Sequence, residues 1–235
     1  MAKKTFALGP LGSKFFSLMQ ARHQTLIRQG ELQSALGLTP AQEQTLLKRL
    51  AGKGFLLRLQ RGIYLVPKTL PTRGFWRPND YYIIHQYMKI LNAKYYIGGL
   101  NAIYHHGLTE QIPNQFTVYN NKYSGKRSFG KLNISFIKND SANIVGFESK
   151  SIPNCGSVNI ATKAKTIIDL IQDWKRYHLI ESAFEWLEQA CNDSNFLKDF
   201  IQLAAKHTNN NTMRRIGYYL EKLGVSDRKL SLIKN

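Results

Sequence analysis

The segment TPAQEQTLLKRLAGKG, residues 39–54, carries helix signals at both of its ends. Thr39 is a favourable N-cap, Pro40 suits the first helical position, and Gln42 completes a capping box with Thr39. Two glycines at the other end favour a stop, because glycine readily adopts the left-handed conformation that closes helices. The sequence therefore predicts a helix with sharply defined limits, and the neighbouring segments must fold around it.

The residues that follow this helix alternate between apolar and polar types. Segments 55–59 and 63–66 predict two strands, and the turn Gln60-Arg61-Gly62 between them supplies a glycine where a positive φ is needed. The alternation predicts one packed face, formed by Leu57, Leu59, Ile63 and Leu65. It leaves Arg58 and Gln60 on the opposite face and Arg61 at the tip of a hairpin.

Two further helices are expected before the helix in residues 39–54 and the hairpin that follows it. Apolar residues recur at near-helical spacing from Lys14 to about Arg28, and ELQSALGL, residues 31–38, indicates a second, short helix. The resulting order, three helices and then a hairpin, is typical of a winged helix-turn-helix. Residues 68–80 contain two prolines and no apolar periodicity, so we place a domain boundary near residue 80.

The rest of the chain, residues 81–235, predicts a mixed α/β domain with a helical end. A helix capped by Asn79 is followed by a strand at 94–97 and by Gly98-Gly99, which favour close backbone packing before another helix. Further strands are expected at 116–120, 132–137, 145–152 and 157–161, with residues 120–131 as a loop. Helices are expected at 162–174, 179–191, 195–207 and 211–224. The predicted fold class is α+β.

The charge of the chain favours a polyanionic partner. The formal net charge is +18, and residues 1–80 hold 13 Lys and Arg against 3 Asp and Glu. No apolar run reaches the roughly 18 residues that a membrane span needs, and Cys155 and Cys191 have no metal-binding spacing. We therefore expect a cytoplasmic protein that does not enter a membrane and needs no metal or other cofactor.

The predicted domain 1–80 contains a candidate surface for double-stranded DNA. Helical spacing buries Leu46, Leu47 and Leu50 and turns a polar, basic face outward. Glu43 falls near the buried side, where we expect it to extend its carboxylate to solvent or to cap a helix, and not to contact a base. Glutamine and lysine can bond base edges in a major groove. The candidate groove-facing residues are Thr39, Gln42, Gln44, Thr45, Lys48 and Arg49. The candidate phosphate contacts on the hairpin are Arg58, Gln60 and Arg61.

Two other groups could contact DNA or a partner protein, or could simply be solvated surface. One is the basic segment with Lys122, Lys126, Arg127 and Lys131. The other is the exposed side of the last helix, with Arg214, Arg215 and Tyr218.

The alternative to a DNA-binding protein without catalytic activity is a DNA-processing nuclease that the winged helix directs to its target. Asp140, Glu148 and Lys150 have the order of the D…ExK set of metal-dependent nucleases, in which carboxylates hold Mg²⁺. Such triplets are common by chance, so we expect a solvated strand face or an inactive nuclease-like core and no catalytic residues. Asp169 and Asp173 lie four residues apart on one helix, and we interpret them as surface charges.

Several stretches resemble the AbiEi-type antitoxins, a family of transcriptional regulators from type IV toxin–antitoxin systems. Residues 37–67, GLTPAQEQTLLKRLAGKGFLLRLQRGIYLVP, are similar to their winged helix, and residues 95–120, YYIGGLNAIYHHGLTEQIPNQFTVYN, to their middle stretch. Residues 161–170 and 211–224 resemble two of their later helices. Thr162-Lys163-Ala164 stands where the family often has Pro-Glu-Arg, so no role of that acidic residue carries over.

The resemblance implies a repressor and antitoxin with two parts. The first domain would bind inverted repeats in its own promoter. The second would antagonise a cognate nucleotidyltransferase-like toxin within a phage-abortive defence system. These roles are expectations from the resemblance, and composition and spacing do not supply them.

Overall fold

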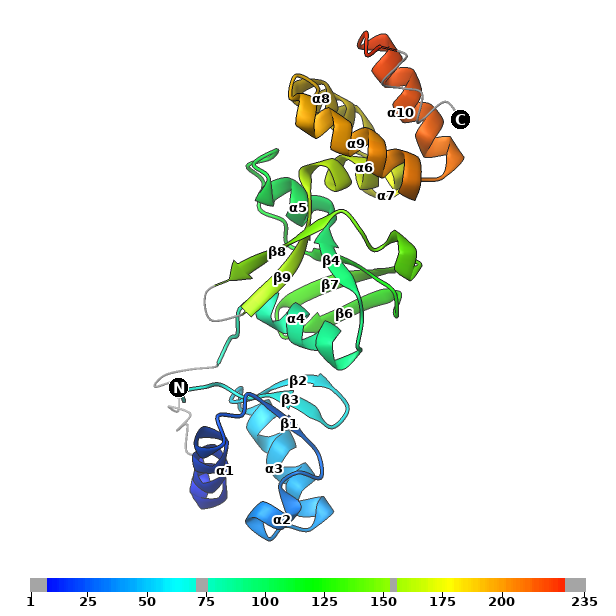
Figure 1. Cartoon of the computed structure of the whole chain (residues 1–235). Coiled ribbons are helices and arrows are strands. Elements are labelled where there is room, and N and C mark those ends of the chain that lie inside the picture. Colours follow the sequence, from blue (N-terminus) through cyan, green and yellow to red (C-terminus); the bar gives the residue numbers. More distant parts are fainter. Residues whose placement is uncertain (1–7, 71–75, 153–155, 227–235) are drawn as a thin grey trace. The chain divides into compact units, whose positions relative to one another are not determined.

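The computed structural model describes residues 8–70, 76–152 and 156–226, and Figure 1 shows the course of the chain. The chain divides into two compact units. The first comprises Met1–Tyr87 with Phe129–Lys131, and the second comprises Met88–Ser128 with Leu132–Asn235. Helices and sheets occur in both, which confirms the α+β class that the sequence predicts. Part of the predicted linker, residues 71–75, lies outside the described residues.

Up to Leu65, the first unit combines three helices with a three-stranded antiparallel sheet. Its elements in order are α1 (Gly9–Ala21), β1 (Leu26–Arg28), α2 (Gln33–Leu36), α3 (Pro40–Gly52), β2 (Leu57–Gln60) and β3 (Ile63–Leu65). The strand order is β1-β3-β2. Apolar side chains of α1 and α3 form the core together with Tyr64 of the central strand.

The prediction of one helix from Lys14 to Arg28 is wrong in its second half. Helix α1 ends at Ala21, and His23 has a positive φ of 50° that turns the chain away from the helix. Leu26–Arg28 then forms β1, in which Ile27 pairs with Tyr64 of β3. Helical spacing of apolar residues did not reveal this strand, because the strand depends on hydrogen bonds to a hairpin more than thirty residues later.

Helix α3 begins and ends as the sequence predicts. The Gln42 backbone N–H donates to Thr39 Oγ1 at 3.3 Å, and the Thr39 N–H donates to Gln42 Oε1 at 2.9 Å, so the capping box is complete. At the other end the Phe55 N–H donates to the Leu50 carbonyl at 3.0 Å, across a residue with left-handed φ, Gly54. The C-terminal end of α3 thus leads directly into the hairpin.

The predicted packed face of the hairpin is only partly right. Leu59 and Leu65 are buried, Arg58 and Arg61 are exposed, and Gly62 has the expected positive φ. Tyr64 is nevertheless buried, and Leu57 and Ile63 are only half-buried. A register shift between Arg58 and Gln60 breaks the alternation, and consecutive buried residues in β3 show that the central strand is covered on both faces.

The second unit is built on a six-stranded mixed sheet. Helix α4 (Asp80–Ile90), capped by Asn79 as predicted, begins in the first unit and continues into the second at Met88. It is followed by β4 (Tyr95–Gly98) and α5 (Gly99–His105). The remaining strands are β5 (Phe116–Asn120), β6 (Gly125–Phe129), β7 (Leu132–Lys138), β8 (Phe147–Ile152) and β9 (Gly156–Ala161), in the order β6-β7-β5-β4-β9-β8. Strand β6 lies where the sequence predicted a loop, because it pairs with β7 despite its glycine and charged residues.

The helical end of the second unit packs around α6 (Lys163–Gln172). Helices α7 (Trp174–Tyr177), α8 (Ile180–Ala190), α9 (Ser194–His207) and α10 (Asn210–Lys222) follow it, and this group lies at one end of the sheet (Figure 1). Every α6 residue from Ala164 to Ile171 is buried, against α5, α8, α9 and α10 among others. Among the residues described, no helix has the length and apolar character to cross a membrane.

Candidate functional site

Helix α3 presents a polar and basic face to solvent. Leu46, Leu47 and Leu50 are buried, as the helical spacing predicts. The predicted groove-facing residues lie on the outer side, where all are exposed except the half-buried Gln44: Thr39, Gln42, Gln44, Thr45, Lys48 and Arg49. The exposed part of the helix therefore carries hydrogen-bonding and positive groups.

The one carboxylate of α3, on Glu43, faces inward. It is fully buried and accepts hydrogen bonds from the Gly30 N–H at 2.8 and 2.9 Å, the Leu32 N–H at 3.1 Å and Gln33 Nε2 at 3.1 Å. These bonds tie the start of α2 to α3. Glu43 therefore does not extend to solvent, and it does not cap α2, whose first turn has no side-chain cap. As a result, α3 shows no negative charge to solvent.

The hairpin adds two exposed cations to the same unit. Arg58 donates from Nε to the Gln60 carbonyl at 3.3 Å, which holds its side chain along the strand, and Arg61 is exposed in the turn. Gln60 is half-buried. The nine predicted DNA-contact residues thus all belong to the first unit, and each of them is at least partly exposed to solvent.

The other candidate contacts are dispersed. Lys122 and Lys126 are exposed, Lys126 and Arg127 lie on β6, and Lys131 falls in the turn assigned to the first unit. The Arg127 guanidinium lies 5.2 Å from the ring centroid of Tyr123. On α10, Arg214 is exposed, Tyr218 is 69% exposed, and the Arg215 guanidinium lies 5.5 Å from the Trp174 ring centroid. The structure does not gather them into one site.

The three nuclease-like residues lie at two separate elements of the second unit. Glu148 and Lys150 form an ion pair of 3.2 Å on β8, with both side chains more than 40% exposed. Asp140 precedes a separate 3₁₀ turn, Ser141–Asn143. Within residues 8–70, 76–152 and 156–226, no group of three His, Cys, Asp or Glu side chains is placed to hold a metal ion.

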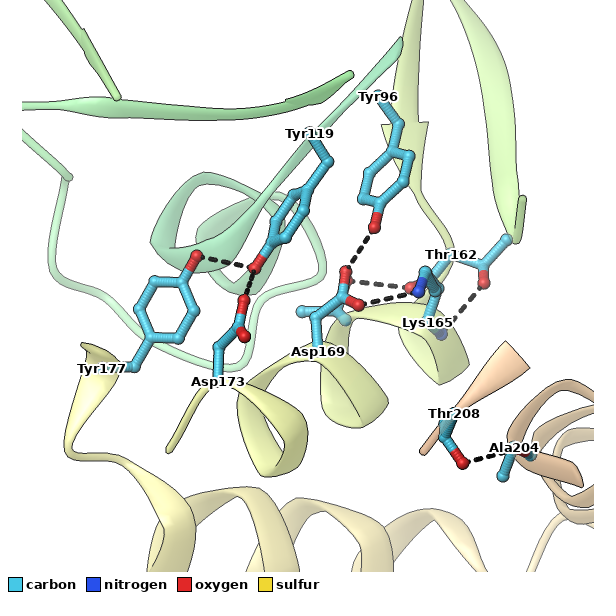
Figure 2. Close-up of polar contacts among 10 residues, drawn as sticks. Tyr96, Tyr119, Thr162, Lys165, Asp169, Asp173, Tyr177, Ala204 and Thr208 are labelled. Carbon is cyan, nitrogen blue, oxygen red and sulfur yellow. Dashed lines mark hydrogen bonds and ion pairs between the residues drawn. The ribbon is translucent and has the colours of Figure 1, made fainter. Parts of the chain in front are cut away.

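A buried polar network in the second unit was missed by the sequence interpretation. Lys165 Nζ lies 2.8 Å from Asp169 Oδ1, with both side chains at most 3% exposed, and the Tyr96 hydroxyl donates to Asp169 Oδ2 at 2.9 Å (Figure 2). The Tyr119 hydroxyl donates to Asp173 at 2.8 Å. Interpreting Asp169 as a surface charge was therefore wrong, and Asp173 is half-buried and hydrogen-bonded.

The network is directional. Because Tyr119 gives its proton to Asp173, the Tyr177 hydroxyl donates to Tyr119 across their 3.0 Å contact (Figure 2). Burial raises the pKa of Asp169, although the nearby Lys165 ammonium lowers it in part. Burial also raises the pKa of Tyr177 to about 12. The tyrosines thus remain neutral donors that join β4 and β5 to α6 and α7.

Gly98-Gly99 makes room for these tyrosines. A Cβ atom on Gly98 would lie 2.9 Å from the Tyr119 ring, and one on Gly99 would lie 2.7 Å from the Tyr177 hydroxyl oxygen. Gly99 also has a positive φ of 59°. The predicted reason for this pair, close packing before a helix, is confirmed.

The sequence of α6 carries no clear signal for the network. Ile167, Ile168, Leu170 and Ile171 lie on one side of the helix, and Lys165 and Asp169 lie together on the other side. Opposite charges four residues apart on the polar side of a helix are typical of solvated surface, so the burial of this pair depends on the elements packed against it.

Comparisons with known proteins give one family and one fold. Residues 36–176 match the model of a family of unknown function, DUF6088. A search of curated proteins gives no significant match. Among solved structures, the crystal structure of the RV2827C protein from Mycobacterium tuberculosis is similar, with a TM-score of 0.60 and 12% identity over 94% of this chain and 80% of that chain. At this identity the similarity concerns the fold alone.

Proposed function

This chain belongs to the DUF6088 family of unknown function, and we propose that its first unit is a winged helix-turn-helix that binds double-stranded DNA in a sequence-specific way. One observation carries the proposal. The only carboxylate of α3, that of Glu43, is buried and accepts hydrogen bonds from the segment before α2. The polar and basic residues of the same helix face solvent. A helix free of exposed negative charge suits insertion into the major groove.

The order of elements supports this assignment. Helix α2 and helix α3 are joined by a short turn at Gly37, which has a left-handed φ of 64°, and the β2–β3 hairpin follows α3 directly. In a winged helix-turn-helix, such a hairpin lies along the DNA backbone, and Arg58 and Arg61 are exposed on it. Both arginines would then neutralise phosphates without reading sequence.

For the whole chain we propose a cytoplasmic autorepressor that is also an antitoxin. It would bind inverted repeats in its own promoter, and its second unit would counteract a cognate nucleotidyltransferase-like toxin during phage defence, without catalysis of its own. The resemblance to the AbiEi-type antitoxins supports this part, above all in residues 95–120. Those residues form β4, α5 and β5 of the second unit.

Replacing Arg58 or Arg61 by alanine should weaken binding to every DNA sequence. Each arginine that neutralises one phosphate releases about one counterion, so the slope of log Kd against log salt should fall by about one per substitution. Fluorescence anisotropy with labelled duplexes over a salt series measures this slope. Equal slopes in the variants and the parent would rule out phosphate contacts by the hairpin.

Substitutions on α3 are the matched contrast within the same experiment. Gln44→Ala or Lys48→Ala should cost about 1–3 kcal/mol at particular base pairs and little at others, because base-edge bonds carry sequence information. A set of duplexes with single base-pair changes separates the two behaviours. If base preference is unchanged in both variants, these side chains do not read the sequence.

A further inference from the structure

The second unit has an apolar groove between α5, the loop that follows it, and α8. Its cavity has a volume of about 330 Å³, with Leu100, Ile103, Ile112 and Trp186 among the lining side chains. The lining is not fully covered, since Ile112 is 74% exposed and Leu100 is 41% exposed. Tyr104, one turn after Leu100 on α5, is 42% exposed. Exposed apolar clusters of this kind mark interaction surfaces.

The groove is also the acidic region of a strongly basic chain. The two segments that build it, residues 99–116 and 179–197, contain no Lys or Arg, although the chain has 33 of them. They contain Glu110, Glu181, Glu185, Glu188 and Asp193. Glu188 accepts a hydrogen bond from the Tyr219 hydroxyl, and Asp193 caps α9. The other three carboxylates are exposed, and each is adjacent in the sequence to a residue that lines the groove.

This combination selects the class of ligand. Nucleic acid is repelled by exposed glutamates, and the exposed rim is poorly suited to enclose a small molecule. We propose that the groove binds a segment of a partner protein that carries large apolar anchors flanked by lysine or arginine. The apolar anchors would fill the cavity beside Trp186, and the cationic flanks would meet Glu110 and Glu185.

The inference goes beyond DNA binding by the first unit and holds whether or not that unit binds DNA. It also gives the proposed toxin-directed role of the second unit a defined contact surface. The groove includes α5 and the loop after it, which lie within residues 95–120, the stretch on which the resemblance to antitoxins is strongest.

The test uses the full chain and a labelled amphipathic peptide of leucine and lysine at helical spacing. A peptide of the same pattern with glutamate in place of lysine is the control ligand. The chain's net charge of +18 repels a cationic peptide elsewhere, so binding of the lysine peptide reports the acidic region. Fluorescence anisotropy should show binding of the lysine peptide that depends on groove residues, whereas any binding of the glutamate peptide to basic surfaces should not depend on them.

Variants assign the binding to the groove. Ile112→Asp should weaken lysine-peptide binding by about tenfold or more, because it removes an anchor contact at an exposed position where folding is not at stake. The charge reversal Glu110→Lys/Glu185→Lys should weaken it by a similar factor. The matched control is Tyr218→Asp, another exposed large side chain, on α10; it should change binding by less than about twofold.

Three results would overturn the proposal. One is no binding of the lysine peptide at low salt. Another is an equal loss in Ile112→Asp and Tyr218→Asp. The third is a parent chain that dimerises and becomes monomeric with Ile112→Asp in sedimentation, since this would assign the groove to a second copy. DNA binding by Ile112→Asp is expected to be unchanged, so a failure of the groove proposal and a failure of the DNA-binding proposal are separate observations.

Discussion

Replacing Lys165 by methionine is expected to destabilise the second unit by about 3–5 kcal/mol, since it leaves a buried carboxylate without its cation. Lys165 and Asp169 are both almost fully buried and lie 2.8 Å apart. Methionine keeps most of the side-chain volume, so the loss reports the missing charge and not a cavity. Urea unfolding followed by circular dichroism measures it.

The pH dependence of this variant follows from the same buried carboxylate. Burial already raises the pKa of Asp169, and removal of the neighbouring ammonium raises it further. The folded variant then holds a proton that the unfolded chain releases at about pH 4, so its stability falls as the pH rises from the unfolded pKa through the folded pKa. Its deficit relative to the parent should accordingly be smaller near pH 4 than at pH 7.

Two comparisons control for non-specific effects. Lys206→Met removes an exposed lysine from α9 and should change stability by no more than about 0.5 kcal/mol. The double variant Lys165→Met/Asp169→Asn should recover part of the loss, because an amide has no charge yet still offers an acceptor to Tyr96. If the double variant is no more stable than Lys165→Met, the ion pair does not account for the effect.

Replacing Glu43 by alanine should destabilise the first unit by about 3 kcal/mol. The substitution removes the acceptor of the Gly30 and Leu32 N–H groups and of the Gln33 amide, in a place closed to solvent. Amide hydrogen exchange gives a local measurement. Protection of the Gly30 and Leu32 N–H groups should fall, because both lose their acceptor. DNA affinity should fall too, since α3 loses its tie to α2.

Glu31 supplies a matched control for this prediction. Its carboxylate also accepts a backbone N–H, that of Arg28 at 3.3 Å, but it is exposed to solvent. Glu31→Ala should therefore cost less than about 1 kcal/mol, because water replaces the lost acceptor. Equal losses in the two variants would show that the burial of Glu43 has no special part in holding α2 to α3.

Local signals predicted much of the fold. The ends of α3 follow from contacts within a few residues, the capping box of Thr39 and Gln42 and the glycines near residue 54, and they were predicted correctly. The inward direction of Glu43 followed from helical spacing in the same way. By contrast, β1 and β6 exist because each pairs with another strand, which periodicity within the segment does not report.

The buried network and the groove depend on contacts still more distant in the sequence. Tyr96 and Asp169 are 73 residues apart, and Tyr119 and Asp173 are 54 apart. The spacing of the two aspartates was compatible with a solvated helix, and their place on the polar side of α6 gave no indication of burial. The groove joins residues near 100 to residues near 186, so its acidic character becomes visible only when the fold brings the two segments together.

The most direct test of DNA recognition is footprinting of the full chain on the DNA upstream of its own gene. At near-physiological salt we predict protection of an inverted repeat, with an affinity about a thousandfold or more above that for random duplex. A chain without residues 1–80 should give no protection. Equal affinity for upstream and random DNA, or undiminished protection by the shortened chain, would contradict sequence-specific binding by the first unit.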